Sequence, residues 1–310
     1  MAQDMREPGE VLQTAPQQVG TLPAGMRPKP TVWKNLRDFS VSKPLGAGGA
    51  AIAILLILVA IFAPLIATHD PELTNHKTVL ASPSGEMFLG GDQIGRDVFS
   101  RLVYGARISL LVGILSVLFG VSIGFGLGLI SAYFGGKADL GIQRVMDAIM
   151  SFPALILALA IMAVLGASIV NVVIALSAVF VPGAARTIRS QALSIKETDY
   201  VLAARAVGVA DVRIMLRHMA PNLMATYIVL ATISLGWAIV VEASLSFLGV
   251  GVPPSVPTWG GMLNGASKHV EVAWWVAVFP GVAITLVVFA WNLLGDALRD
   301  VLDPKLRSSS

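Results

Sequence analysis

The chain has 310 residues, of which 55% are hydrophobic and only 13% are charged, and its mean hydropathy is +0.76. This composition excludes a single soluble core and indicates a membrane protein. The net charge of +3 disfavours a nucleic-acid partner, and the absence of Cys excludes disulfides, iron–sulfur clusters, thiolate zinc sites and cysteine nucleophiles.

The first 44 residues are rich in Gln and Pro and carry Asp4, Glu7 and Glu10 before any apolar segment. These features do not fit a cleavable signal peptide, and we expect residues 1–44 to form a disordered cytoplasmic tail. The uncharged stretch Leu45–Thr68 reaches about 36 Å at roughly 1.5 Å per residue, which is enough to cross a bilayer. Residues 45–107 are therefore expected to form the first transmembrane helix and an extracytoplasmic loop.

Four further apolar stretches follow along the chain. They are Ile108–Gly136, Ala148–Ala185, Leu223–Val241 and Val272–Gly295. The second stretch is too long for one crossing, and Gly166 marks the place for a hairpin that divides it in two. The sequence thus predicts an all-α membrane protein with six transmembrane helices. Residues 108–303 would form its transmembrane core, and residues 304–310 a short cytoplasmic tail.

The distribution of basic residues predicts the orientation of these spans. With the N-terminus inside, 17 of the 22 Lys and Arg fall on the cytoplasmic side. The other five are Lys77, Arg96, Arg101, Arg107 and Lys268. Because cytoplasmic loops retain Lys and Arg, we expect both termini in the cytoplasm.

The longest loop between spans, residues 186–222, is too long for a turn and is predicted to form two short helices. Helical spacing in the first gives an apolar, mostly small face, made of Tyr200, Ala203, Ala204 and Val207. Gly208 ends this helix, Asp211 is expected to cap the second, and Pro221 opens the next span. The same spacing recurs in the second helix at Val212, Met215, Leu216 and Met219. Periodicity alone leaves two interpretations open: helices that lie on the membrane surface or against their own bundle, or an element that docks on another protein.

This loop resembles the EAA loop of ABC importer permeases, the element that seats in a groove of a cytoplasmic ATPase subunit. The family's pattern is present at Ala203, Ala204, Gly208 and Pro221. Leu202, His218 and Ala220 stand where that pattern has Glu, Ile and Leu, and these departures are similar to the dipeptide/oligopeptide branch. Residues 88–110, 242–263 and 292–304 are also similar to stretches of that branch.

The resemblance implies the type I (MetI-like) ABC importer permease fold in a bacterial inner membrane. It implies a non-catalytic subunit that, with a homologous second permease, forms the path for di- or oligopeptides. Two cytoplasmic ATPases would bind ATP and Mg, a substrate-binding protein would deliver cargo outside, and this chain itself would bind no cofactor or metal. The ATPase-coupling residues would be Tyr200, Ala203, Ala204, Arg205, Gly208, Arg217, His218 and Pro221. Nickel, haem-related molecules and glutathione, which the same branch also carries, stay open as cargo.

A stand-alone secondary carrier or channel is the alternative from a different class. Such a protein is expected to place ionisable residues inside its spans, whereas nearly all charge here lies outside them. Asn171, Glu242 and Asn292 are polar at membrane depth and are candidates for the translocation path. For Glu242, an interfacial position with water access is an equal alternative.

Three glycines in the second predicted span and one pair of charges in the outer loop have spacings that predict contacts. Gly120, Gly124 and Gly128 recur every four residues, which favours close helix packing, within the chain more than with a partner. Asp97 and Arg101 have the spacing of a helical ion pair. The chain has no GxxxxGK[ST] phosphate loop, so we do not expect it to hydrolyse ATP.

Overall fold

The computed structural model describes Arg37 and residues 39–302. It divides into two compact units, Met1–Ser42 and Lys43–Ser310; of the first, Arg37 and residues 39–42 are described and are helical. Of the predicted tails, 1–44 and 304–310, only Arg37 and residues 39–44 are among the described residues. Within 43–302 the regular structure is helical, and the only β pairing is an isolated bridge between Gly91 and Asp97.

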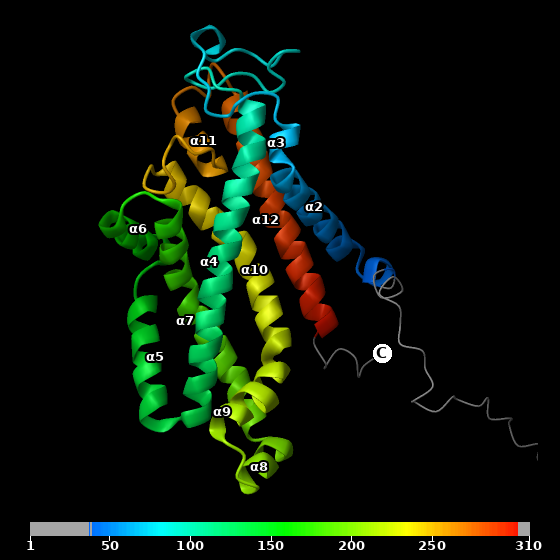
Figure 1. Ribbon diagram of the computed structural model, residues 1–310, viewed down its shortest axis with the longest axis vertical. Coiled ribbons are helices and arrows are strands. Elements are labelled where there is room, and N and C mark those ends of the chain that lie inside the picture. Colours follow the sequence, from blue (N-terminus) through cyan, green and yellow to red (C-terminus); the bar gives the residue numbers. More distant parts are fainter. Residues whose placement is uncertain (1–36, 38, 303–310) are drawn as a thin grey trace, which may run out of the picture. The chain divides into compact units, whose positions relative to one another are not determined.

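Five helices of the second unit are long and apolar enough to cross a membrane. They are α2 (Pro44–Ile61), α4 (Val98–Phe134), α7 (Ile169–Lys196), α10 (Ala220–Phe247) and α12 (Trp275–Leu302). Two shorter helices, α5 (Gly136–Met150) and α6 (Ala154–Leu165), are bent by 89° and together can form a sixth span. The predicted all-α fold with six spans is confirmed when this bent pair is counted as one span (Figure 1).

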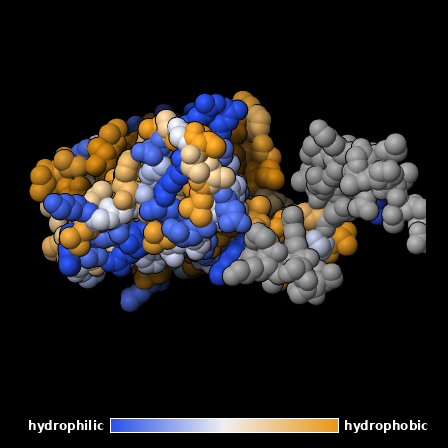
Figure 2. Space-filling view, turned by 90° about the horizontal axis from the view of Figure 1, so that it is seen from below, coloured by the Kyte–Doolittle hydropathy of each residue, from blue (hydrophilic) through white to orange (hydrophobic). Residues whose placement is uncertain are grey.

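The remaining elements are short and lie near the two ends of the helical unit. They are α3 (Ala63–Ile66), the 3-10 turn η2 (His76–Thr78), α8 (Asp199–Ala206), α9 (Asp211–Arg213), the π-helical turn η3 (Ile214–Met219) and α11 (Trp259–Ala266). Figure 1 shows α8 and α9 at one end, which we call the α8 end, and α11 with residues 67–97 near the other, the α11 end. Seen from the α8 end, hydrophilic residues gather in the middle of the surface and hydrophobic ones at its sides (Figure 2).

The longest helix, α4, is packed against α7 so closely that glycine is required where their backbones meet. A Cβ atom on Gly120 would lie 2.7 Å from the carbonyl oxygen of Ser177. On Gly124 it would lie 2.6 Å from that of Val181, and on Gly128 2.4 Å from that of Ala185. These distances are shorter than any normal van der Waals contact, so the three glycines form a contact within the chain.

Several helix boundaries differ from the predicted ones, three of them by ten residues or more. The second span begins at Val98 and not at Ile108, the third begins at Gly136 and not at Ala148, and α7 continues to Lys196, about three turns beyond Ala185. The predicted boundaries fall at charged residues, and the helices continue through them: Arg107 within α4 is exposed, whereas Asp147 and Arg186 pair with each other. Arg186 of α7 contacts Asp147 of α5, and the Arg189 guanidinium donates to Asp139 at 2.5 and 2.6 Å.

Candidate functional site

Helix α8 forms where the sequence predicts it, and it packs on the bundle through Val201 and Ala204. Val201 is fully buried and Ala204 nearly so, in a cluster with Ile214, Met219 and Leu223. Of the predicted apolar face, Ala204 alone points inward; Tyr200, Ala203 and Val207 are exposed. Most of the face that the spacing groups together is therefore turned away from the bundle.

The segment from α8 to η3 exposes several large apolar side chains. They are Tyr200, Leu202 and Val207 in or directly after α8, Val212 in α9 and Leu216 in η3. Exposed apolar residues on a segment between spans are candidates for contact with a partner. In the second predicted helix, Met215 and Met219 are buried whereas Val212 and Leu216 are exposed, so that set is also split between two environments.

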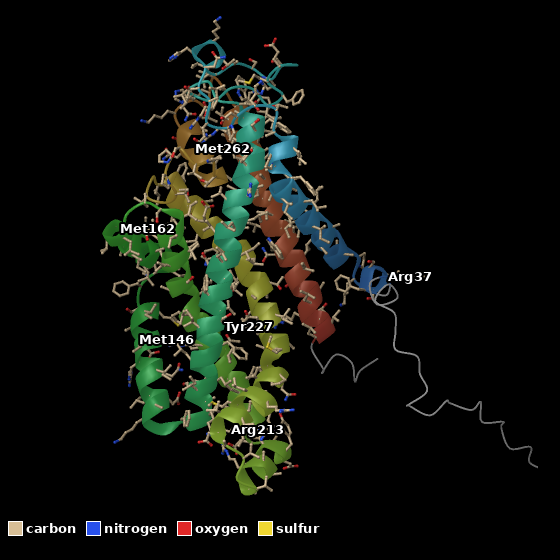
Figure 3. All side chains as sticks on the ribbon, viewed as in Figure 1. Arg37, Met146, Met162, Arg213, Tyr227 and Met262 are labelled. Carbon is tan, nitrogen blue, oxygen red and sulfur yellow. The ribbon has the colours of Figure 1, made fainter. Side chains whose placement is uncertain are left out.

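The turn between α8 and α9 is made by Gly208, as predicted. Its φ of +77° is a left-handed conformation that side chains rarely adopt, and the helix ends two residues before it. The predicted cap of the second helix is wrong: Ala210 is the N-cap of α9 and Asp211 is its first residue, whose carboxylate is hydrogen-bonded to Tyr133 instead. Arg213, at the end of α9, is exposed at this end of the molecule (Figure 3).

Pro221 lies in the first turn of α10, as predicted. This helix is not separate from the segment before it, because α9, the π-helical turn η3 and α10 form one unbroken helical run from Asp211 to Phe247. Proline has no N–H to donate to the preceding turn, and a π-helical turn is one way for a helix to accommodate this. The neighbouring Asn222 donates its side-chain N–H to the carbonyl of His218 at 2.7 Å.

The first turn of α10 is also hydrogen-bonded to α8. The Nδ2 of Asn222 donates to the Tyr200 hydroxyl at 3.1 Å, and that hydroxyl lies 3.5 Å from the His218 carbonyl oxygen. Arg217 is exposed and His218 is half-buried. Of the eight candidate coupling residues, the structure thus brings Tyr200 and His218 together. Both lie beside the first turn of α10, which contains Pro221.

The three candidate path residues have different environments. Asn171 donates its side-chain N–H to the carbonyls of Leu165 (2.8 Å) and Gly166 (3.0 Å), so it closes the hairpin between α6 and α7. Asn292 is exposed on α12 and donates to the carbonyl of Val288 at 3.0 Å. These contacts give Asn171 a structural role and leave Asn292 available to a ligand.

Glu242 is fully buried, so the interfacial alternative with water access is wrong. Its Oε1 accepts a hydrogen bond from the Ser246 hydroxyl at 2.9 Å. Its Oε2 has no hydrogen-bond partner within the part of the chain that the structure describes. The carboxyl group lies inside the protein because α11 packs directly on α10 here: a Cβ on Gly260 would be 2.4 Å from the Ala243 carbonyl oxygen.

The predicted Asp97–Arg101 pair is also wrong. Asp97 caps the N-terminus of α4, where it accepts hydrogen bonds from the Ser100 amide and from the Thr68 hydroxyl, both at 3.0 Å. Capping uses the carboxylate at the helix start, and Arg101 is directed elsewhere. Its guanidinium lies 3.7 Å from Asp92 and donates to the carbonyl of Pro71 at 2.9 Å.

Sequence reasoning missed a hydroxyl pair at membrane depth. Ser122 of α4 and Tyr227 of α10 have their hydroxyl oxygens 2.9 Å apart, and Ser122 is exposed (Figure 3 shows Tyr227). The criterion that selected Asn171 and Asn292 would have found both residues if it had included hydroxyl groups. Sequence reasoning also missed Tyr133. The signal that could have found it is a polar aromatic residue in the last turn of an apolar span.

Comparisons with known proteins assign the family. Residues 124–308 match the family model described as binding-protein-dependent transport system inner membrane component, and residues 32–83 match the N-terminal transmembrane domain of oligopeptide transport permease C. The chain belongs to the permease family of ABC importers. The permease is therefore a multi-pass protein of the inner membrane, in a family of transport components that work with an ATPase and a binding protein.

Its relatives are similar over most of their length. The permease is 44% identical to a dipeptide transport system permease protein of Alkalihalophilus pseudofirmus, with 89% of this chain and 91% of the relative covered. It is 46% identical to a glutathione transport system permease protein of Escherichia coli O6:K15:H31, with coverage of 83% and 86%. It is 41% identical to a putative peptide transport system permease protein of Brucella suis biovar 1, with coverage of 84% and 87%.

A solved structure supports the predicted fold. The inward-facing MetNI methionine ABC transporter contains a chain that matches with a TM-score of 0.55 at 20% identity. The match covers 66% of this permease and 96% of that chain. The type I ABC importer permease fold expected from the sequence is thereby confirmed.

Proposed function

We propose that this permease forms, with a homologous second permease, the path through which an ATP-driven importer carries di- or oligopeptides. The observation that carries the proposal is its 41–46% identity to permeases named for peptide, dipeptide and glutathione transport. Glutathione is itself a tripeptide, so these names share one chemical class. Nickel and haem-related cargoes have no such support, and a stand-alone carrier or channel is disfavoured because the chain belongs to an ABC importer family.

In this proposal the exposed side of α8 seats in a cytoplasmic ATPase subunit. Support comes from Tyr200, Ala203 and Val207, which are exposed and lie next to the glycine turn at Gly208. Small side chains let a partner's backbone approach closely, and the larger apolar ones supply area to bury. Two such ATPases would bind ATP and Mg, an extracytoplasmic binding protein would deliver cargo, and this subunit would catalyse no reaction.

The test of this assembly is purification of the tagged permease from its native membrane in mild detergent, followed by mass spectrometry. We expect a second multi-span protein and ATPases with phosphate loops to co-purify. The reconstituted complex, supplied with its binding protein, should take up a labelled dipeptide in the presence of ATP. Recovery of the chain alone across several mild detergents would overturn the assembly. Uptake of nickel but of no peptide would overturn the cargo.

We also propose that both termini and the α8 end face the cytoplasm. The chain has no native Cys, so single cysteines report their own position. Lys77 lies in residues 67–97 and Lys137 at the start of α5, and both are exposed. In right-side-out vesicles a membrane-impermeant maleimide should label Lys77→Cys but not Lys137→Cys, and inside-out vesicles should give the opposite result. The reverse pattern would contradict this orientation.

A further inference from the structure

Tyr133 of α4 contacts both helices of the α8–α9 segment. It lies in the last turn of α4, and only 5% of its surface is exposed. Its hydroxyl donates to Oδ1 of Asp211, the first residue of α9, at 2.5 Å. The guanidinium carbon of Arg205, in the last turn of α8, lies 4.8 Å from the centre of its ring. One side chain of α4 therefore holds both sides of the Gly208 turn.

We propose that Tyr133 is a positioning residue that passes the movement of α8 and α9 to α4 during transport. This rests on the proposed function, in which ATPase subunits move α8. A hydrogen bond to a carboxylate is stronger than one between neutral groups, and a cation over an aromatic face adds to it. The tyrosine ring is rigid and buried, so a displacement of Asp211 or Arg205 is passed on instead of being absorbed by side-chain rotation.

The end of α4 is braced, so it would move as part of a larger body. The Ser131 hydroxyl donates to Asp139 of α5 at 2.5 Å, and the same carboxylate accepts from Arg189 of α7. Lys196, also on α7, donates to the carbonyl of Ala132 at 3.1 Å. With the glycine contact between α4 and α7, these bonds join three helices at the point where Tyr133 is attached.

Besides the apolar packing of α8 and η3 on α4 and α7, a further connection from α9 runs through the main chain into α10. It passes through the π-helical turn η3, whose hydrogen bonds are less regular than those of an α-helix. The side-chain tie on this route joins Tyr200 and Asn222, which are both exposed. If Tyr133 were lost, movement of α8 would still displace α10, but the α4–α7 pair would follow it less closely, because only apolar packing would then join the two. ATP would then be hydrolysed with less cargo moved.

The test is Tyr133→Phe in the complete reconstituted importer, with peptide uptake and ATP hydrolysis measured together. The ring and its contact with Arg205 are kept, and the hydroxyl is lost. We expect normal assembly, an unchanged KM for peptide, and a fall of about fivefold or more in peptide carried per ATP hydrolysed, the lower end of coupling between sites. Tyr104→Phe, the same change at the other end of α4, is the matched control and should keep the wild-type ratio.

A second pair of variants separates coupling from a structural defect. Asp211→Asn still offers an oxygen to the Tyr133 hydroxyl, so it should keep most of the peptide carried per ATP hydrolysed. Asp211→Leu offers none, so it should lower this ratio as Tyr133→Phe does. A wild-type ratio in Tyr133→Phe, or an equal loss in both Asp211 variants, would overturn the proposal. Failure of the proposed function looks different, because the unsubstituted importer would then carry no peptide or contain no ATPase.

Discussion

Replacing Asp92 with alanine is expected to remove most of the permease from the membrane. The Asp92 side chain is 8% exposed and accepts a hydrogen bond from Nε of Arg96 at 2.7 Å, while Nε of Arg101 lies 3.7 Å away. Its Oδ1 also accepts from the backbone N–H groups of Ile94 and Arg96. Removal of the carboxylate leaves two guanidinium groups buried without it. Breaking a buried pair in this way costs about 3–5 kcal/mol, a large part of the roughly 5–15 kcal/mol that stabilises a typical domain.

Membrane abundance and the unfolding temperature in detergent measure this effect. Glu86→Ala removes a carboxylate from the same segment, but Glu86 is exposed, so this control should unfold at the wild-type temperature. Asp92→Asn keeps an acceptor for the backbone N–H groups and should fall between the two. An Asp92→Ala protein as abundant and as stable as Glu86→Ala would show that the two arginines find other partners.

Alanine in place of Gly124 or Gly128 is expected to destabilise the α4–α7 contact, whereas alanine in place of Gly126 is not. The new Cβ atoms would lie 2.6 and 2.4 Å from carbonyl oxygens of α7, which cannot move without shifting the helix. Such overpacking costs about 1–3 kcal/mol per site. At Gly126 nothing in the described residues lies within 4 Å of the new Cβ, and alanine favours a helix over glycine by about 1 kcal/mol.

The three variants therefore differ in the sign of their effect and not only in its size. Gly126→Ala should unfold at the wild-type temperature or above it, and Gly124→Ala and Gly128→Ala below it. Equal unfolding temperatures in all three would mean that α4 and α7 are further apart than described. A lower unfolding temperature in Gly126→Ala alone would instead indicate that this face of α4 contacts the partner permease.

The number and order of the spans could be predicted because long apolar stretches have few alternatives in a membrane protein. Their ends could not, because a helix continues through a charged residue that stays exposed, as Arg107 does, or that finds a partner, as Arg186 does. Arg189 lies within α7 because Asp139, 50 residues earlier, accepts its hydrogen bonds. That pairing depends on how α5 folds back along α7, which no local pattern shows.

For the α8 site, the sequence predicts which residues share a face but not which face the bundle covers. Tyr200 and Ala203 form a recognisable apolar set with Val207, yet Val201 is the residue that the core buries. The apolar residues that the bundle leaves exposed are therefore the ones that a docking partner could contact. Glu242 shows the same limit, since an acid near a span end can be solvated or enclosed depending on distant segments.

The π-helical turn η3 has a geometric consequence for the whole α8–α9 segment. A π-helical turn contains more residues than an α-helical one, and each residue of an α-helix advances the chain by about 100° around the axis. The turn η3 thus takes up one extra residue, and α9 leaves α10 in nearly the direction that a regular helix one residue shorter would give. Deleting one residue within η3 would therefore restore a regular helix and leave α8 close to its present place, whereas deleting one residue from the regular part of α10 would rotate α8 by about 100° around the helix axis.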